Sequence, residues 1–305
     1  MQATRFAIIA PCFNEATVVG NFLKELDTVL ADLPGGFLVV LVDDGSQDDT
    51  AAVASAYVPR SSNMVLQVIK SPYNRGHQHA IYDGLVAASS TEAQRFIVMD
   101  SDGEDDPAAI KDLVRLSDKE LVFVTRGKRS ESWGFKLGYL LYRVLFKLLT
   151  RRSIDHGNYS MIGRNVLQAV MDHSFVHYPA FLSRSQFKQE KIVYDRRPRI
   201  DGRSKMNFTR LSDHAFRSLI EYSEEILSRF LGVLVFLIIT FMLTIIAIII
   251  IKVFTERAIP GWASILTATL FNCIVICAGF FSLGSLLVNT TRRREKLRGR
   301  TSIQL

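Results

Sequence analysis

The stretch RFIVMDSDGEDDP, residues 95–107, joins an apolar run to a cluster of acidic side chains. Five acidic residues occupy the seven positions from Asp100 to Asp106, in a chain whose formal net charge is +7. Such a cluster is either a solvated turn or a site for a cation that holds a more negative ligand. Because Asp100 and Asp102 alternate after a rigid strand, both could reach one site as oxygen ligands for Mg²⁺ or Mn²⁺.

Segments typical of buried strands alternate with segments typical of helices across the first 125 residues. Apolar runs predict strands at 5–10, 37–42, 64–70, 95–99 and 120–125. Helical periodicity or capping signals predict helices at 15–33, 50–58, 76–89 and 107–116. Unbroken apolar strands that alternate with helices indicate an α/β fold with a parallel sheet covered on both faces.

Ligands of such sheets bind beyond the carboxyl ends of the strands. Four polar clusters fall at these ends: Asn14 with Glu15, Asp43 with Asp44, Asn74 with Arg75, and Asp100 with Asp102. The Asp43–Asp44 pair could hydrogen-bond a base or ribose, and Arg75 could contact a phosphate or ribose. Together the clusters predict a site for a nucleoside diphosphate and a metal. The Rossmann and P-loop glycine patterns are both absent, which argues against those two kinds of nucleotide site.

Two long apolar segments follow the predicted α/β region. Residues 230–254 carry one charge, Lys252, and residues 262–288 carry none. Both segments exceed the roughly 20 residues that span a bilayer core. Basic residues gather after the second segment: Arg292, Arg293, Arg294, Lys296, Arg298 and Arg300. The positive-inside rule therefore predicts a transmembrane hairpin with both termini and the α/β domain in the cytoplasm.

The expected organisation has four parts, listed by residue number: an α/β domain at 1–205, a juxtamembrane amphipathic helix at 206–229, two transmembrane helices at 230–288 and a basic cytoplasmic tail at 289–305. Residues 133–149 combine aromatic side chains with a basic stripe, which indicates either an interfacial helix on anionic lipids or an ordinary core helix. Residues 196–205 add further cations. Nucleic acid is an alternative partner for this charge, but the two apolar segments favour anionic lipids or polyprenyl phosphate, without nucleic acid.

Four ordered motifs carry a family resemblance: APCFNE (10–15), LVDDGSQDDT (41–50), SPYNRGHQHAIYDGL (71–85) and MDSDGEDDP (99–107). They resemble the family 2 glycosyltransferases, which have a GT-A fold with a Rossmann-like, mostly parallel sheet. With the hairpin, the chain is similar to polyprenyl-phosphate glycosyltransferases of the dolichol-phosphate mannose synthase and bactoprenol glucosyltransferase type. The resemblance implies inverting transfer of a sugar from a UDP- or GDP-sugar to undecaprenyl or dolichyl phosphate. It further implies a metal-dependent enzyme of a bacterial inner membrane.

The resemblance also implies roles for single residues. The residues implied to bind the nucleotide sugar are Pro11, Asn14, Glu15, Asp44, Arg75, Asp100 and Ser101. Those implied to bind the metal, Mg²⁺ or Mn²⁺, are Asp100 and Asp102. Those implied to bind the acceptor phosphate are Arg126, Arg129, Ser204 and Lys205. The segment IDHGNYSMI, residues 154–162, resembles a catalytic segment, and it adds Asp155 and Asn158 to Asp102 as candidate catalytic residues.

The chain departs from the family in that catalytic segment. Asn158 stands where relatives carry an acid, and Ser160 stands where they carry arginine. A phosphate monoester has a second pKa of about 6 and is mostly dianionic at neutral pH, so it needs a general base less than a hydroxyl acceptor does. An amide at position 158 is therefore compatible with a phosphate acceptor, and the identity of any base stays open.

Other functions are also compatible with the sequence. Transfer to another membrane lipid, processive polysaccharide synthesis, or a membrane-anchored sugar-nucleotide-binding protein with a degenerate site are alternatives. The absence of a Q-x-x-R-W signature argues against processive synthesis, and the intact Asp100 and Asp102 argue against a degenerate site. Association of copies through the transmembrane hairpin is left open.

Overall fold

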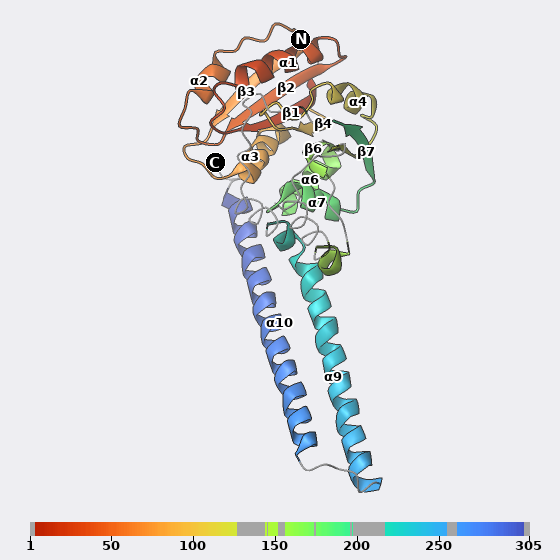
Figure 1. Cartoon of the computed structure of the whole chain (residues 1–305). Helices are drawn as coiled ribbons and strands as arrows, with labels where there is room; N and C mark the ends of the chain where they lie inside the picture. Colours follow the sequence, from red (N-terminus) through yellow and green to blue (C-terminus); the bar gives the residue numbers. More distant parts are fainter. Residues whose placement is uncertain are drawn as a thin grey trace. The chain divides into compact units, whose positions relative to one another are not determined.

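The computed structural model describes residues 4–126, 144, 146–151, 156–173, 175–195, 197, 217–254 and 261–301. The chain divides into two compact units. One unit, called here the sheet unit, comprises Met1–Val144 and Arg152–Glu221, and the other, the hairpin unit, comprises Leu145–Arg151 and Tyr222–Leu305. Figure 1 shows the sheet and the two long helices that characterise them.

The sheet unit contains a seven-stranded sheet in the order β3-β2-β1-β4-β6-β5-β7. Its strands are β1 (Thr4–Cys12), β2 (Gly36–Asp43), β3 (Met64–Lys70), β4 (Arg95–Val98), β5 (Leu121–Arg126), β6 (His156–Gly163) and β7 (Gln189–Tyr194). Only β6 runs against its two neighbours, β4 and β5. The mostly parallel sheet predicted from the apolar runs is confirmed, and β6 and β7 are additions that those runs did not predict.

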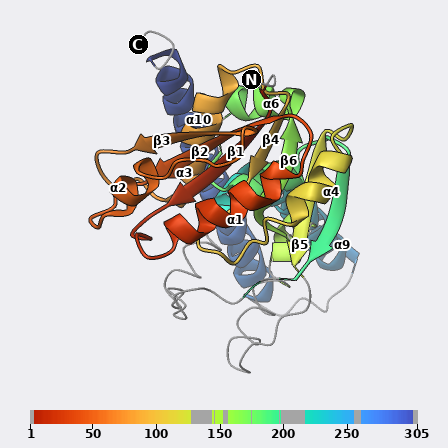
Figure 2. The same cartoon turned by 90° about the horizontal axis from the view of Figure 1, so that it is seen from above.

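In the described part of the sheet unit, these helices pack on the strands: α1 (Val19–Ala31), α2 (Thr50–Ser55), α3 (His77–Ser89), α4 (Ala109–Arg115), α6 (Arg164–His173) and α7 (Tyr178–Arg184). Alternate side chains of a strand point to opposite faces of a sheet. Ile8 accordingly joins a buried cluster with α1, α2 and α4, whereas Ile9 joins a second cluster with α3, α6 and α7. The sheet is therefore covered on both faces, and Figure 2 shows α1 and α6 on opposite sides of it.

The antiparallel strand β6 brings its amino end to the edge where the parallel strands end. Val98, the last residue of β4, lies opposite Ser160 in β6. In an antiparallel pair the residue numbers run in opposite directions, so two positions beyond Val98 and two before Ser160 face each other. This register places Asp100 next to Asn158.

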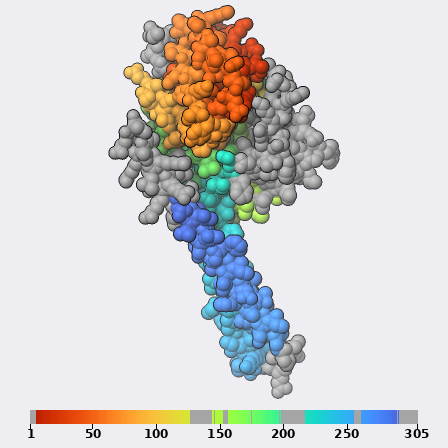
Figure 3. All heavy atoms as spheres, turned by 90° about the vertical axis from the view of Figure 1, so that its left-hand side faces the viewer, coloured from red at the N-terminus to blue at the C-terminus, as the bar shows by residue number. Residues whose placement is uncertain are grey.

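The hairpin unit contains α9 (Ser223–Phe254) and α10 (Trp262–Thr301). Both helices are long and apolar enough to cross a membrane, by length and composition. Helix α9 begins at Ser223, seven residues before the apolar segment predicted at 230–254, and continues through that segment without a break. The backbone of α10 remains helical beyond Val288, the end of the second apolar segment. Figure 3 shows α10, in blue, in front of α9, in cyan, and the two helices pack against each other.

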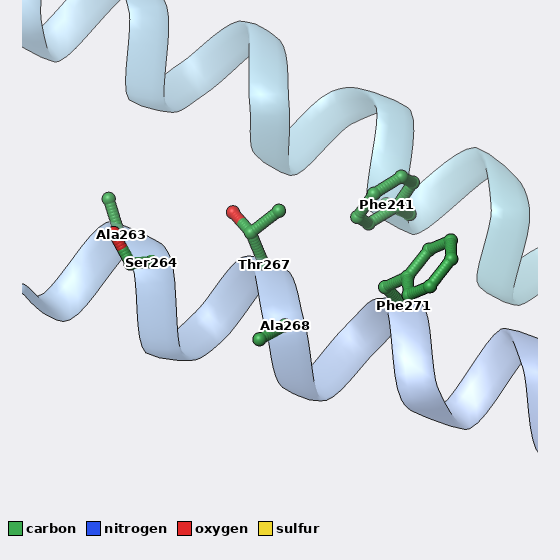
Figure 4. Close-up of a pocket in the computed structure, with 6 residues that line it drawn as sticks. All are labelled: Phe241, Ala263, Ser264, Thr267, Ala268 and Phe271. Carbon is green, nitrogen blue, oxygen red and sulfur yellow. The ribbon is translucent and has the colours of Figure 1, made fainter.

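The apolar side chains of the hairpin unit are largely exposed, for example Phe236, Ile246 and Leu283. Between the helices lies a cavity of about 480 Å³ that is lined by Phe241 of α9 and by five residues of α10: Ala263, Ser264, Thr267, Ala268 and Phe271 (Figure 4). The small side chains of α10 leave this space open, and the rings of Phe241 and Phe271 lie 6.5 Å apart beside it. An exposed apolar surface of this extent indicates a membrane environment.

The helix predicted over residues 133–149 falls mostly outside the described residues. Its described part, residues 144 and 146–149, is helical. In the hairpin unit, Arg229 donates hydrogen bonds from Nη1 to the carbonyl oxygens of Leu148 (2.9 Å) and Leu149 (2.6 Å). This arginine therefore satisfies carbonyl groups at the end of that helical segment, which have no partner within the helix.

Candidate active site

The loops that follow β2 and β3 hold each other in place. The Asp44 carboxylate accepts hydrogen bonds from the backbone amides of Arg75 and Gly76, both at 2.8 Å. Gly45 has φ +70, and a Cβ atom there would lie 2.4 Å from the backbone of Tyr73. Only glycine combines this conformation with so close an approach. The motifs DDGS and YNRG are therefore two halves of one packed structure.

The loop after β1 is joined to the same structure. The backbone amide of Asn14 donates to Ser46 Oγ at 2.9 Å, and the side-chain oxygen Oδ1 of Asn14 accepts from the backbone amide of Gln47 at 2.9 Å. Asn14 itself has φ +52, a left-handed conformation that asparagine tolerates better than most residues. The Glu15 amide donates to Thr50 Oγ1 at 2.8 Å, which links the loop to the first residue of α2.

Asp43 is completely buried beneath these loops. Its Oδ1 accepts from the amide of Ser46 at 3.0 Å and from the Ser46 hydroxyl. Its Oδ2 has no hydrogen-bond partner among the described residues. An unsatisfied buried acceptor costs about 1–3 kcal/mol, so a donor supplied by a ligand would stabilise this carboxylate. The sequence predicted contacts of the Asp43–Asp44 pair with a base or ribose, and Asp44 also accepts hydrogen bonds from the neighbouring loop.

The acidic segment after β4 contacts the β1 loop through Ser101. Ser101 is buried, and its Oγ lies 2.7 Å from the carbonyl oxygen of Pro11 and 2.6 Å from Glu15 Oε2. Asp105 shapes the segment by accepting from the Asp100 amide at 2.9 Å, and Asp102 Oδ1 accepts from the Glu104 amide at 3.0 Å. The structure therefore brings together the residues that the sequence predicted to bind the nucleotide sugar and the metal.

Asp100 also contacts two residues from other elements. His77 Nε2, at the start of α3, lies 3.2 Å from Asp100 Oδ1, and Asn158 Nδ2, in β6, lies 3.3 Å from the same oxygen. Desolvation opposes protonation of the imidazole, but the hydrogen bond to Asp100 and nearby negative charges raise the pKa of His77 above its usual value. His77 Nε2 also lies 2.9 Å from Asn158 Nδ2. Sequence reasoning did not select His77, although its place after a glycine at the sheet edge was a usable signal.

The comparison with known families decides the class of this protein. Residues 7–174, more than half of the chain, match the family described as Glycosyl transferase family 2. The chain belongs to glycosyl transferase family 2. The resemblance carried by the four sequence motifs is confirmed, and the chain is a glycosyltransferase.

Individual relatives extend over different parts of this glycosyltransferase. A Bacillus subtilis (strain 168) protein, uncharacterized glycosyltransferase YkcC, is 25% identical over 287 residues, or 89% of this chain and 85% of that protein. An undecaprenyl-phosphate 4-deoxy-4-formamido-L-arabinose transferase of Sodalis glossinidius (strain morsitans) is 25% identical over 174 residues, or 56% of this chain and 52% of that protein.

The fold is shared with solved glycosyltransferase structures. Glucosyl-3-phosphoglycerate synthase from Mycobacterium tuberculosis, crystallised with Mn²⁺, uridine diphosphate and glucosyl-3-phosphoglycerate, superimposes with a TM-score of 0.53 at 15% sequence identity. The match covers 73% of this chain and 80% of that chain. The predicted GT-A fold is confirmed.

The acidic segment could hold a divalent cation if waters and phosphate oxygens supply the cation's other ligands. Within the described part of the chain, no three His, Cys, Asp or Glu side chains are grouped so that they alone could hold a metal ion. Mg²⁺ in particular is commonly held by one or two carboxylates, with waters and phosphate oxygens as the other ligands. Asp100 and Asp102 supply such a pair at the sheet edge.

Several predicted site residues lie outside the described residues: Arg129, Asp155, Ser204 and Lys205. Arg126 is the last residue of β5, at the same edge of the sheet, and its side chain is not described. Arg197, one of the cations at 196–205, forms ion pairs of 2.8 Å with Glu25 and with Asp106. Its guanidinium therefore pairs with acids of the protein itself.

Proposed function

We propose that this glycosyltransferase moves a sugar, with inversion, from a UDP- or GDP-sugar to a polyprenyl phosphate at a membrane. The observation that carries the proposal is the sheet edge where the loops after β1, β2 and β3 meet Asp100 and Asp102, in a chain that also contains two apolar helices. The printed name of the Sodalis relative, an undecaprenyl-phosphate sugar transferase, supports the choice of acceptor.

The donor nucleoside would bind over the loops held by Asn14, Glu15 and Asp44. The Arg75 guanidinium, which pairs with Asp83 at 2.8 Å, is partly exposed and would reach a phosphate or the ribose. Asp44 would act through the loop rather than through direct contact, because both of its oxygens already accept backbone hydrogen bonds.

In the proposed reaction, an oxygen of the acceptor phosphate attacks C1 of the sugar, and the bond from C1 to the diphosphate oxygen breaks. The leaving nucleoside diphosphate gains negative charge, which a bound Mg²⁺ or Mn²⁺ would neutralise. Asp100 and Asp102 would hold that cation, and His77 contacts Asp100 at 3.2 Å beside it. Because the acceptor is already a dianion, the neutral amide of Asn158 is compatible with catalysis without a carboxylate at that position.

The acceptor would enter from the membrane side. The proposed acceptor-phosphate ligands are Arg126, Arg129, Ser204 and Lys205. Helices α9 and α10 would anchor the chain in a bacterial inner membrane, with the sheet unit and both termini in the cytoplasm. The basic residues after Val288 would meet anionic lipid headgroups, each worth about 1 kcal/mol near such a surface.

A direct test uses membranes that contain the full chain, undecaprenyl phosphate and a panel of UDP- and GDP-sugars, with the lipid products identified by mass. We expect one donor to yield a sugar linked to undecaprenyl phosphate. Membranes with the Asp102→Asn variant are the matched control. A second arm replaces undecaprenyl phosphate with diacylglycerol. Product in the diacylglycerol arm alone, or no glycolipid from any donor, would overturn the proposed acceptor.

A further inference from the structure

A chain of hydrogen bonds runs from the start of α7 to Asp100. The Tyr178 backbone amide donates to Gln78 Oε1 at 2.6 Å. Gln78 Nε2 then donates to Asn158 Oδ1 at 3.4 Å, and Asn158 Nδ2 donates to Asp100 Oδ1 at 3.3 Å. Gln78 and His77 are neighbours at the first turn of α3, so one helix end contacts Asp100 directly and through Asn158.

The donor–acceptor direction of these linked hydrogen bonds is determined at the Tyr178 end. A backbone N–H can only donate, so Gln78 must turn its oxygen toward Tyr178 and its NH₂ group toward Asn158. Asn158 must then turn its oxygen toward Gln78, which leaves its NH₂ group facing Asp100. The two ends of a side-chain amide are nearly equal in shape, so packing alone would not distinguish them. Hydrogen bonding to Gln78 does, and so does His77 Nε2, which lies 2.9 Å from Asn158 Nδ2 and can accept from it when that ring nitrogen carries no proton.

The same tyrosine also anchors the backbone of Asn158. The Tyr178 hydroxyl lies 3.1 Å from Ser160 Oγ, and Ser160 Oγ donates to the Asn158 carbonyl oxygen at 3.0 Å. Tyr178 is fully buried, and Gln78 and Asn158 are each 9% exposed. Water therefore has little access to replace a lost partner, and a mismatched contact stays unsatisfied. Ser160 thus occupies a structural place in the site, which accounts for a hydroxyl at this position.

We propose that Gln78 is a positioning residue that turns the Asn158 amide so that an N–H group, not a carbonyl oxygen, faces Asp100. The inference rests on the proposed function, in which Asp100 serves the donor diphosphate. An N–H group at this place holds the Asp100 carboxylate in one orientation. A carbonyl oxygen there would repel it and shift the position in which the diphosphate is bound.

Two substitutions at position 78 separate polarity from packing. Gln78→Glu keeps the shape and can still accept from Tyr178, but its second oxygen accepts from Asn158 and turns that amide over. Gln78→Met keeps the approximate volume and lets Asn158 adopt either orientation. Gln67→Glu, on the exposed side of β3, adds the same charge away from the site and serves as control.

We expect Gln78→Glu to lower kcat at least about tenfold with a donor KM within about threefold of the parent, and Gln78→Met to lower kcat less. Gln67→Glu should match the parent. A purely structural role predicts the reverse order, because methionine leaves the buried Tyr178 amide without an acceptor. Parental kcat in Gln78→Glu, or a larger loss in Gln78→Met, would overturn the inference while leaving the proposed function intact.

A stability measurement tests the same polarity without any substrate. Gln78 presents an N–H group to position 158, so Asn158→Asp alone keeps that hydrogen bond, but its second oxygen faces Asp100 and should lower the Tm of the detergent-purified full chain. Combined with Gln78→Glu, it would set two carboxylates against each other. We expect the double variant to lose more Tm than the two single variants together. Additive shifts would mean that Gln78 does not orient Asn158, even if no sugar donor supports transfer.

Discussion

Asp44 and Gly76 are joined across two loops by a hydrogen bond of 2.8 Å from the Gly76 amide to Asp44 Oδ2. The other oxygen of Asp44 accepts from the Arg75 amide. Asp44→Asn replaces one of these two accepting oxygens with an NH₂ group, so a donor then faces the N–H donor of the backbone. We expect the free energy of unfolding to fall by about 1–3 kcal/mol, and the affinity for UDP or GDP to fall with it. Thermal unfolding and calorimetric nucleotide binding measure the two effects.

Asp49→Asn is the matched control for this change. Asp49 lies in the same loop, is exposed, and makes no capping hydrogen bond through its side chain at the start of α2. It should retain the parental Tm and nucleotide affinity. Equal effects of Asp44→Asn and Asp49→Asn would show that charge in this loop matters and that the contact with Gly76 does not.

We expect sugar transfer to depend on a divalent cation held by the acidic segment. Asp102→Asn removes one of two proposed carboxylate ligands, and we expect transfer to fall about a hundredfold or more, as when other preorganised charge stabilisation is removed. EDTA should have the same effect on the parent, and added Mn²⁺ should reverse it. Binding of Mn²⁺, followed by its electron paramagnetic resonance signal, should weaken in the variant at unchanged Tm.

Asp118→Asn provides the comparison for the metal prediction, since Asp118 is an exposed acid that pairs only with neighbouring Lys119 in the described contacts, at 2.9 Å. Its transfer rate and Mn²⁺ binding should equal those of the parent. Full activity of Asp102→Asn, or of the parent in EDTA, would exclude the proposed metal–diphosphate site.

The distribution of basic residues predicts the orientation of the hairpin. Tags at both termini should be accessible from the cytoplasmic side alone, and a tag in the turn at 255–261 from the opposite side alone, because basic residues flank the cytoplasmic ends of membrane helices. Protease protection in sealed vesicles of either orientation measures this. A carboxyl terminus accessible only from the side of the turn would contradict the hairpin.

Arg126 is the proposed ligand of the acceptor phosphate at the end of β5. A charge-assisted contact is worth roughly 1.5–3 kcal/mol, so Arg126→Ala should weaken acceptor use about ten- to a hundredfold. Arg126→Lys should recover only part of this, because lysine lacks the planar fork of arginine. Steady-state kinetics with each substrate varied in turn would reject the assignment if the donor KM rose and the acceptor KM did not.

Arg164 is expected to stabilise the fold without taking part in transfer. Its guanidinium donates to the carbonyl oxygens of Ser89, Thr91 and Ala93, at distances from 2.5 to 3.2 Å, where α3 ends. Arg164→Lys cannot satisfy three carbonyl groups at once, and we expect a loss of about 2–3 kcal/mol in the free energy of unfolding. Arg115→Lys, an exposed residue in α4, should change it by less than about 0.5 kcal/mol. Chemical denaturation distinguishes the two.

The strands and helices before residue 126 were predictable because their signals are local. Apolar runs such as FLVVLV and glycine-rich turns such as DDGS carry the information in neighbouring residues. Strand β6 carried no such signal, since Asn158 and Ser160 interrupt its apolar side chains although both are buried. Their burial is possible only because Gln78 and Tyr178, far away in the sequence, supply hydrogen-bond partners.

The sequence by itself determined the family, the parallel α/β core and the two apolar helices, because motifs, periodicity and hydropathy depend on residues close together in the chain. It also identified Asp100 and Asp102 by their place after a strand. Only the tertiary structure decided that Asp44 supports a loop, that Asp43 has an unsatisfied oxygen, and that His77 and Asn158 meet at Asp100. Those relationships follow from strand order and from the antiparallel register of β6, which depend on packing between distant segments.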